Sequence, residues 1–215
     1  MIAACRHNAM PLICGYATTW LTYSHGGQLF RYERDGVTSL LIDEVKALVG
    51  HDGQQEIGDV ASGTLKLAVD DIGLQAWISP PSTAFGDRIV TAVRTGQLSG
   101  LSIGADVDSV SGGCIQRRVI DRLLEVSLTD CPRNKTTCCI VAEDYQRHLH
   151  ASLCAPSVNP QEQLRMLERR NWRQSGDAAL ADYYGRQIAM RRLCKLAAHN
   201  AKYSGRTQRI VTHLV

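Results

Sequence analysis

The sequence lacks the features that mark several large classes of protein. None of its apolar stretches approaches the roughly 20 residues that a membrane-spanning helix needs, so we expect no membrane segment and no membrane partner. Neither a basic leader nor an apolar core precedes Cys5, which argues against a secretory signal and for a cytoplasmic protein. Only 6% of the residues are aromatic, so stacking on nucleic-acid bases is not an evident theme.

The eight cysteines lack the spacings that metals and disulfides need. None forms a Cys-x-x-Cys pair, and Cys138 and Cys139 are adjacent. Such spacing suits neither a zinc knuckle nor an easily closed disulfide. Thiols in a chain of this size without a secretory signal are expected to stay reduced. We interpret the cysteines as small buried apolar residues, and we expect no metal and no other cofactor.

The length and charge of the chain predict two regions. The 215 residues suffice for one well-buried domain with a helical appendage. Residues 160–215 carry 11 Lys and Arg against 4 Asp and Glu, a balance of +7, and the rest of the chain carries −4. Helices are predicted at about 161–173 and 178–202. We therefore predict a domain over residues 1–155 and a basic helical tail over 156–215 that meets an acidic partner.

Short alternating runs predict mainly β structure between residues 12 and 145. Residues 65–69 and 74–78 alternate on either side of a turn signal, which predicts a hairpin. Apolar residues recur at three- and four-residue steps within 82–97, which predicts a helix that stops at Gly96. The same patterns predict three further strands, at about 101–107, 124–128 and 136–141, and a turn at 111–113.

Two polar side chains lie on the polar faces of predicted strands. Ser102 stands in the segment Gly-Leu-Ser-Ile-Gly, between apolar residues that alternate with it. Glu125 alternates in the same way with Leu124, Val126 and Leu128. Because side chains alternate across a strand, Ser102 and Glu125 both project from the face opposite the apolar residues.

A histidine ends a third predicted strand and completes a set of groups suited to acyl transfer. A serine hydroxyl is a weak nucleophile and needs a neighbouring base. His51 ends the run that starts at Val45, and imidazole titrates near neutral pH. Glu125 would accept the other imidazole N–H, which fixes the tautomer and stabilises the imidazolium. Asp52 would point to the opposite face from His51. We predict Ser102, His51 and Glu125 as catalytic residues if they meet in space.

The Gly-x-Ser-x-Gly pattern leaves an esterase open. In α/β-hydrolases this pattern marks a strand-to-helix turn, and the acid and the histidine follow the serine in the chain. Asp130 and either His148 or His150 would fill those roles. The residues after Gly104, however, predict a strand rather than a helix.

A series of segments carries a resemblance to a known family. These segments are 13–17, 45–52, 57–58, 62–67, 71–74, the helix before Gly96, 100–104, and 125–128 followed by Pro132. In this order they resemble the prohead maturation serine proteases of tailed bacteriophages, a family related in fold to the herpesvirus assemblin proteases. The resemblance covers about three-fifths of the chain. Two departures are visible: Ala105 replaces a common bulky aromatic residue, and Arg34–Val37 lies where the family often has Pro-Gly-Ala-Phe.

The resemblance implies an α+β, mainly β, fold: a compact β-barrel-like core with flanking helices, here followed by the helical tail. It implies that Ser102 is the nucleophile and His51 the base. Glu125 would be the third member, a position where related proteases use a histidine. Oxyanion donors would be main-chain N–H groups near Arg133 and Asn134.

The resemblance also implies a role and partners. The protein would be a serine endopeptidase that cleaves phage scaffold and major capsid protein extensions, and its own tail, inside the immature head in the host cytoplasm. Relatives of this fold tend to form homodimers. The alternative is a non-catalytic assembly module whose basic region, 160–215, docks on acidic capsid or scaffold partners or makes a weak nucleic-acid contact.

Overall fold

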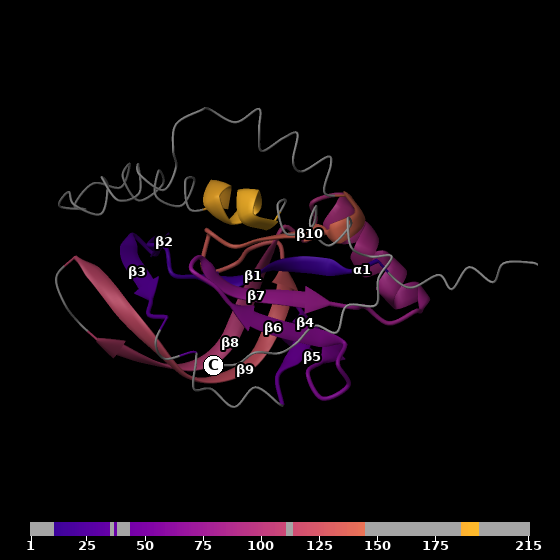
Figure 1. Ribbon diagram of the computed structural model, residues 1–215, viewed down its shortest axis with the longest axis horizontal. Helices are drawn as coiled ribbons and strands as arrows, with labels where there is room; N and C mark the ends of the chain where they lie inside the picture. Colours follow the sequence, from indigo (N-terminus) through magenta and orange to yellow (C-terminus); the bar gives the residue numbers. More distant parts are fainter. Residues whose placement is uncertain (1–10, 35–36, 38–43, 111–113, 145–185, 194–215) are drawn as a thin grey trace, which may run out of the picture.

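The computed structural model describes residues 11–34, 37, 44–110, 114–144 and 186–193 (Figure 1). The predicted turn at 111–113, His148, His150 and the predicted helix at 161–173 lie outside these residues. So does the predicted helix at 178–202, except for residues 186–193, which are helical.

One four-stranded antiparallel sheet forms the most buried part of the fold. Its strands follow the order β10-β1-β7-β6. They are β1 (Ile13–Thr19), β6 (Leu65–Val69), β7 (Gly73–Ile78) and β10 (Cys138–Val141). Every residue of β1 and β10 is buried, because apolar clusters cover both faces of the sheet. The predicted hairpin over 65–78 is confirmed, with β6 and β7 paired antiparallel.

A second, six-stranded sheet is built around the long strand β9. Its path is β2-β3-β9-β4-β5, and β8 pairs with β9 off this path. Its strands are β2 (Tyr23–His25), β3 (Gln28–Tyr32), β4 (Lys46–Val49), β5 (Asp52–Asp59), β8 (Gly100–Val110) and β9 (Ile115–Thr129). On one edge, β9 pairs in parallel with β3 through its first half and with β4 through its second half. On the other edge it pairs antiparallel with β8, and both strands are strongly curved in Figure 1.

The helix predicted over 82–97 is confirmed as α1 (Ala84–Arg94). The Thr83 side chain caps its N-terminus by accepting a hydrogen bond from the Gly86 N–H. Gly96 follows its end with a φ of 77°, a left-handed conformation that glycine adopts without a Cβ penalty. Ile89, Val90 and Val93 bury one face of α1 in the main core.

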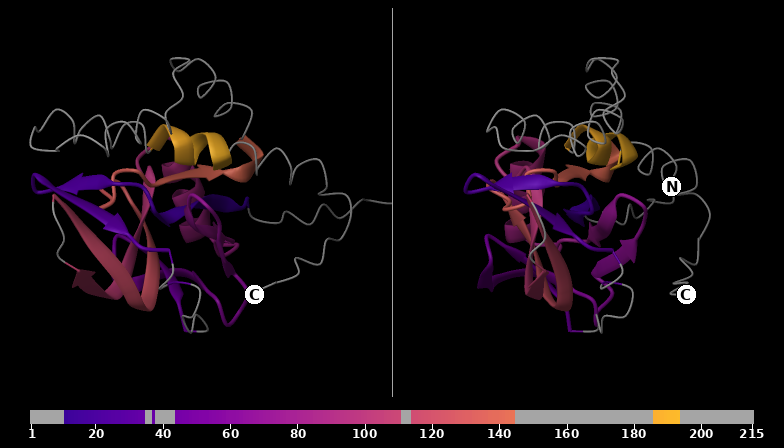
Figure 2. Two further views of the ribbon diagram at one scale, coloured as in Figure 1. Left: turned by 60° about the vertical axis from the view of Figure 1, so that its left-hand side comes forward. Right: turned by 90° about the vertical axis from the view of Figure 1, so that its left-hand side faces the viewer.

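The helix at 186–193 packs on the outer face of the four-stranded sheet, beside β10 (Figure 2). Ile188, Ala189 and Leu193 are buried in a cluster that includes Tyr16 and Ile140. Arginines near the two ends of this helix contact the rest of the fold. The Arg186 guanidinium donates to the Ser99 carbonyl at 3.2 Å, and Arg192 lies 3.4 Å from the Asp70 carboxylate. Part of the predicted tail is therefore packed against the sheets.

The α+β, mainly β, class is confirmed, and the sheets differ in two details from what the sequence predicts. The strands among the described residues form two sheets that do not close into a barrel. Leu124, predicted to face the core, is 41% exposed, whereas Leu123 is 3% exposed. The reason is a bulge: β9 skips Leu124 between its pairings with Gly104 and Ala105, which turns its side chain to solvent.

Candidate active site

Ser102 and Glu125 lie on adjacent strands and share a face, as predicted. Ser102 pairs with Ser127, and Gly104 pairs with Glu125. Residues two apart on a strand point to the same side, so the Glu125 and Ser127 side chains are neighbours. Residues directly opposite each other have Cβ atoms about 4.5–5.5 Å apart. Ser127 is therefore a direct neighbour of both the serine and the carboxylate.

His51 lies in a turn and not on a strand, which corrects the prediction. Gly50 and His51 form the two-residue connection between β4 and β5, and each has a φ of 63°. Left-handed φ at both positions is typical of the tight type I′ turn of a hairpin. The Gly50 N–H donates to the Leu128 carbonyl of β9 at 2.9 Å, which holds the turn against the central strand. Local alternation could not reveal this reversal, because the apolar run continues to the glycine.

The structure brings His51 and Glu125 into direct contact. His51 Nδ1 is hydrogen-bonded to Glu125 Oε1, and the Ser127 hydroxyl donates to the same oxygen at 3.3 Å. A carboxylate only accepts, so Nδ1 donates and Nε2 of the neutral ring keeps its lone pair. The histidine side chain is 44% exposed and that of Glu125 is 15% exposed. Nε2 is thus the ring atom left to take a proton.

Asp52 does not compete with Glu125 for the histidine. Its carboxylate accepts from the Gln54 N–H and from Gln55 Nε2, both at 2.9 Å. These hydrogen bonds lower the pKa of Asp52, with the Gln54 N–H as the larger cause. The carboxylate is therefore occupied within its own strand, in agreement with the prediction that Asp52 is poorly placed.

Gly104, two positions after Ser102, lies where the structure has no room for a side chain. A methyl group on Gly104 would lie 2.5 Å from Glu125 Cγ and 2.8 Å from Glu125 Oε1. The Glu125 side chain therefore crosses the space above Gly104 on its way to His51. Moreover, β8 continues to Val110 as a strand, without the strand-to-helix turn of α/β-hydrolases. The esterase interpretation is overturned on this point.

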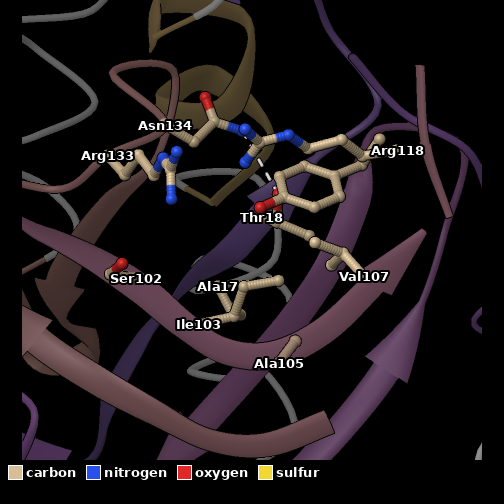
Figure 3. Close-up of a pocket in the computed structure, with 10 residues that line it drawn as sticks. Ala17, Thr18, Ser102, Ile103, Ala105, Val107, Arg118, Arg133 and Asn134 are labelled. Atoms are coloured by element: carbon tan, nitrogen blue, oxygen red, sulfur yellow. Dashed lines mark hydrogen bonds between the residues drawn. The ribbon is translucent and has the colours of Figure 1, made fainter. Parts of the chain in front are cut away.

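Ser102 opens into a small pocket between the two sheets (Figure 3). The cavity measures about 70 Å³, and Ser102 itself is 7% exposed. Its other walls come from β1, from Tyr32 of β3, from Arg118 of β9, and from Arg133 and Asn134 after β9. The segment after β9 is held in place because Asn134 Nδ2 donates to Thr18 Oγ1 at 3.2 Å. The residues expected near the oxyanion donors therefore line the same pocket as the serine.

Sequence reasoning gave no role to three residues of this region: Gly104, Ser127 and Arg118. Ser127 follows Glu125 by two positions, so the alternation that places Glu125 on the polar face places Ser127 there as well. Arg118 carried no local signal, because its position depends on pairing between β9 and two distant strands.

The cysteines agree only in part with the buried interpretation. Cys14, Cys138 and Cys139 are buried, but Cys114 and Cys131 are exposed, because they lie at turns that flank β9. Burial raises the pKa of the Cys139 thiol to about 12.

Within the part of the chain that the structure describes, no group of three or more His, Cys, Asp or Glu is arranged to hold a metal ion. No described helix is long and apolar enough to cross a membrane.

Two solved structures of herpesvirus proteases are similar at low identity. A crystal structure of KSHV protease in complex with a hexapeptide phosphonate inhibitor is 17% identical, with a TM-score of 0.44, over 88% of this chain and 96% of that chain. Kaposi's sarcoma herpesvirus protease in complex with an allosteric inhibitor is 14% identical, with a TM-score of 0.38, over 81% of this chain and 89% of that chain.

A search of curated proteins gives no match. The model of the family described as Caudovirus prohead serine protease, in contrast, matches residues 3–151, which is more than half of the chain. The chain therefore belongs to the caudovirus prohead serine protease family and is a serine protease of phage head maturation.

Proposed function

We propose that Ser102 is the nucleophile of this protease, that His51 is its general base and that Glu125 orients the histidine. The observation that carries the proposal is the hydrogen bond from His51 Nδ1 to Glu125 Oε1. This bond connects the turn after β4, which carries His51, to β9, which carries Glu125. Strand β9 pairs with β8, which carries Ser102. Such a bond fixes the tautomer that leaves Nε2 free to accept the serine proton.

In the first step, Nε2 of His51 takes the Ser102 proton as the hydroxyl oxygen attacks the scissile carbonyl carbon. Glu125 stabilises the imidazolium that forms, and Ser127 holds the carboxylate in position. The imidazolium then gives its proton to the leaving amine, and an acyl-enzyme remains. Water, deprotonated by the same nitrogen, hydrolyses the acyl-enzyme and regenerates the hydroxyl.

The developing oxyanion needs donors close to the attacked carbonyl. Main-chain N–H groups near Arg133 and Asn134 are our candidates, because this segment borders the pocket into which Ser102 opens. Losing one such donor typically lowers turnover by about 10²–10³-fold.

The substrates that we propose are the scaffold and the N- or C-terminal extensions of the major capsid protein, together with the protease's own tail. The site of action would be the procapsid in the host cytoplasm. We also propose a homodimer, a domain boundary near residue 155 and a weak nucleic-acid contact through the +7 region at 160–215.

Co-expression with the scaffold and capsid proteins tests this function. Wild-type protease should shorten both partners and itself, as measured by intact mass, whereas Ser102→Ala should leave all three at full length. Ser109→Ala is the matched control, because it removes an exposed hydroxyl on the same strand, outside the pocket, and should retain cleavage. Processing by Ser102→Ala at the wild-type rate would refute the assignment of the nucleophile. Assembly in the absence of any cleavage by the wild type would favour the assembly module.

A further inference from the structure

Arg118 is a buried cation that forms no ion pair with the residues that the structure describes. Its side chain lies in the interior, with the residue 7% exposed, and its Nε atom has no hydrogen-bond partner. Its Nη1 donates a long hydrogen bond, of 3.5 Å, to the Tyr23 hydroxyl. Its guanidinium stacks 4.1 Å from the centre of the Phe30 ring. Buried charges are normally paired, because desolvation disfavours the charged form.

The preceding residue shows what a paired arginine looks like in the same strand. Arg117 projects from the opposite face of β9 and is exposed. Its Nε lies 2.7 Å from the Glu33 carboxylate, which Arg31 also approaches at 3.6 Å. No ion pair to Arg118 exists among the residues that the structure describes. The Glu33 carboxylate therefore pairs with the exposed Arg117 and not with the buried Arg118.

The neighbours of Arg118 do not neutralise it. Burial raises the pKa of Tyr23 far above its ordinary value, so this phenol stays uncharged at neutral pH. The pKa of His25 is lowered, first by burial and then by Arg133 and Arg118. The two arginines thus create a positive potential at this end of the molecule.

The unpaired cation lines the pocket that contains Ser102. Figure 3 shows the Arg118 side chain extending towards Asn134 and Arg133, with Thr18 below them. The lining includes two arginines and no acidic residue. The volume of the pocket is about 70 Å³. A cavity that accommodates benzene is roughly twice as large, at about 150 Å³. The pocket therefore suits a short polar side chain rather than an aromatic ring.

We propose that this pocket is a substrate subsite for an acidic side chain, with Arg118 as its specificity-determining residue. The side chain would belong to a residue at or next to the cleaved bond, since Ser102 borders the pocket. This inference rests on the proposed role of Ser102 as nucleophile.

The chemistry of a guanidinium explains the expected selectivity. A carboxylate entering the pocket would meet a planar, preorganised donor set and would supply the missing negative charge. An amide of the same shape cannot supply that charge, and a lysine side chain would be repelled by both arginines. The preference should therefore follow charge and not only shape.

The test uses the full chain and peptides. A complex peptide mixture, analysed by mass spectrometry after cleavage, first identifies the preferred bond. Matched peptides then carry Glu, Gln, Ala or Lys at the position that shows selectivity. We expect kcat/KM for Glu to exceed that for Gln by about tenfold or more, and that for Lys by about 10²-fold. Arg118→Gln should abolish the Glu-over-Gln ratio, whereas Arg117→Gln should retain it.

Labelling of Ser102 by a fluorophosphonate separates the two ways to fail. Cleavage and labelling without any preference for an acidic residue would overturn the subsite and leave the nucleophile intact. A preference that survives in Arg118→Gln would overturn it as well. Absence of both cleavage and labelling would refute the proposed function and the subsite with it. If Arg118→Gln fails to fold, the Glu-to-Gln ratio of the wild type alone decides between these results.

Discussion

The two sheets of this protein both contribute to the core, but only the second one carries the candidate catalytic groups. In the four-stranded sheet, β1 and β10 are buried at every position, with apolar clusters on both faces. In the second sheet, β8 is buried at Gly100–Ser102 and becomes exposed towards Val110. The candidate catalytic groups lie on β8 and β9 of the second sheet and in the turn between its strands β4 and β5, at the place where burial gives way to solvent.

This difference explains how a polar site is supported at low energetic cost. Polar groups buried without partners are expensive, whereas groups at the edge of the core keep some contact with water. His51 is 44% exposed in its side chain, and Glu125, at 15%, accepts two hydrogen bonds. The four-stranded sheet contributes Ala17 and Thr18 to the pocket wall without presenting a charged group there. Substitutions in the two sheets should therefore have opposite consequences.

The largest effect is expected from Glu125→Gln in the second sheet. The amide cannot stabilise the imidazolium, so kcat should fall by about 10³–10⁴-fold. The melting temperature should stay close to that of the wild type, because the side chain lies at the edge of the core. Peptide cleavage across a range of pH and thermal unfolding measure the two quantities. Activity within tenfold of the wild type would remove Glu125 from the mechanism.

The converse result is expected from Ile140→Ala in the four-stranded sheet. Ile140 is fully buried against the helix at 186–193, so its truncation should lower the free energy of unfolding by about 2–5 kcal/mol. The kcat of the folded fraction should hardly change. Leu124→Ala, at an exposed position of β9, is the control and should cost less than about 0.5 kcal/mol. Equal costs in chemical denaturation would contradict the division between the sheets.

A smaller effect on activity is expected from Gly104→Ala. The new methyl group would meet the Glu125 side chain, which must shift away from His51. A displacement of about 1 Å can lower turnover by about 10²-fold. Gly53→Ala is a suitable control, because a methyl group there would meet open space. Unchanged kcat in Gly104→Ala would show that Glu125 does not need its present path.

The smallest effect concerns the exposed pair outside the site. The hydrogen bond from Arg117 is the main cause that lowers the pKa of Glu33 from its ordinary value of 4.5. Because the pKa of Glu33 is lower in the folded protein than in the unfolded chain, the ionised side chain stabilises the fold at any pH above its unfolded-state pKa. This stabilisation is lost as the pH falls through the folded-state pKa. Glu33→Gln should therefore cost at most about 1 kcal/mol at pH 7 and nothing at pH 2. A loss that persists at pH 2 would indicate a packing role for the side chain.

The sequence predicted the elements that depend on local patterns. The hairpin at 65–78, the helix that stops before Gly96, and the common face of Ser102 and Glu125 all follow from periodicity and turn residues. The bulge that exposes Leu124 and the pocket around Arg118 depend on register between strands far apart in the chain. No local period encodes such pairing. The reversal at Gly50–His51 was hidden for another reason: the apolar run continues up to the glycine.

The central claim is that Ser102 carries the nucleophile activated by His51, and covalent labelling tests it most directly. Wild-type protein treated with a fluorophosphonate should gain the mass of one adduct, which peptide mapping should locate on Ser102. Labelling should be absent in Ser102→Ala and strongly slowed in His51→Ala. An adduct on another residue, or equal labelling of Ser102 without the histidine, would contradict the account.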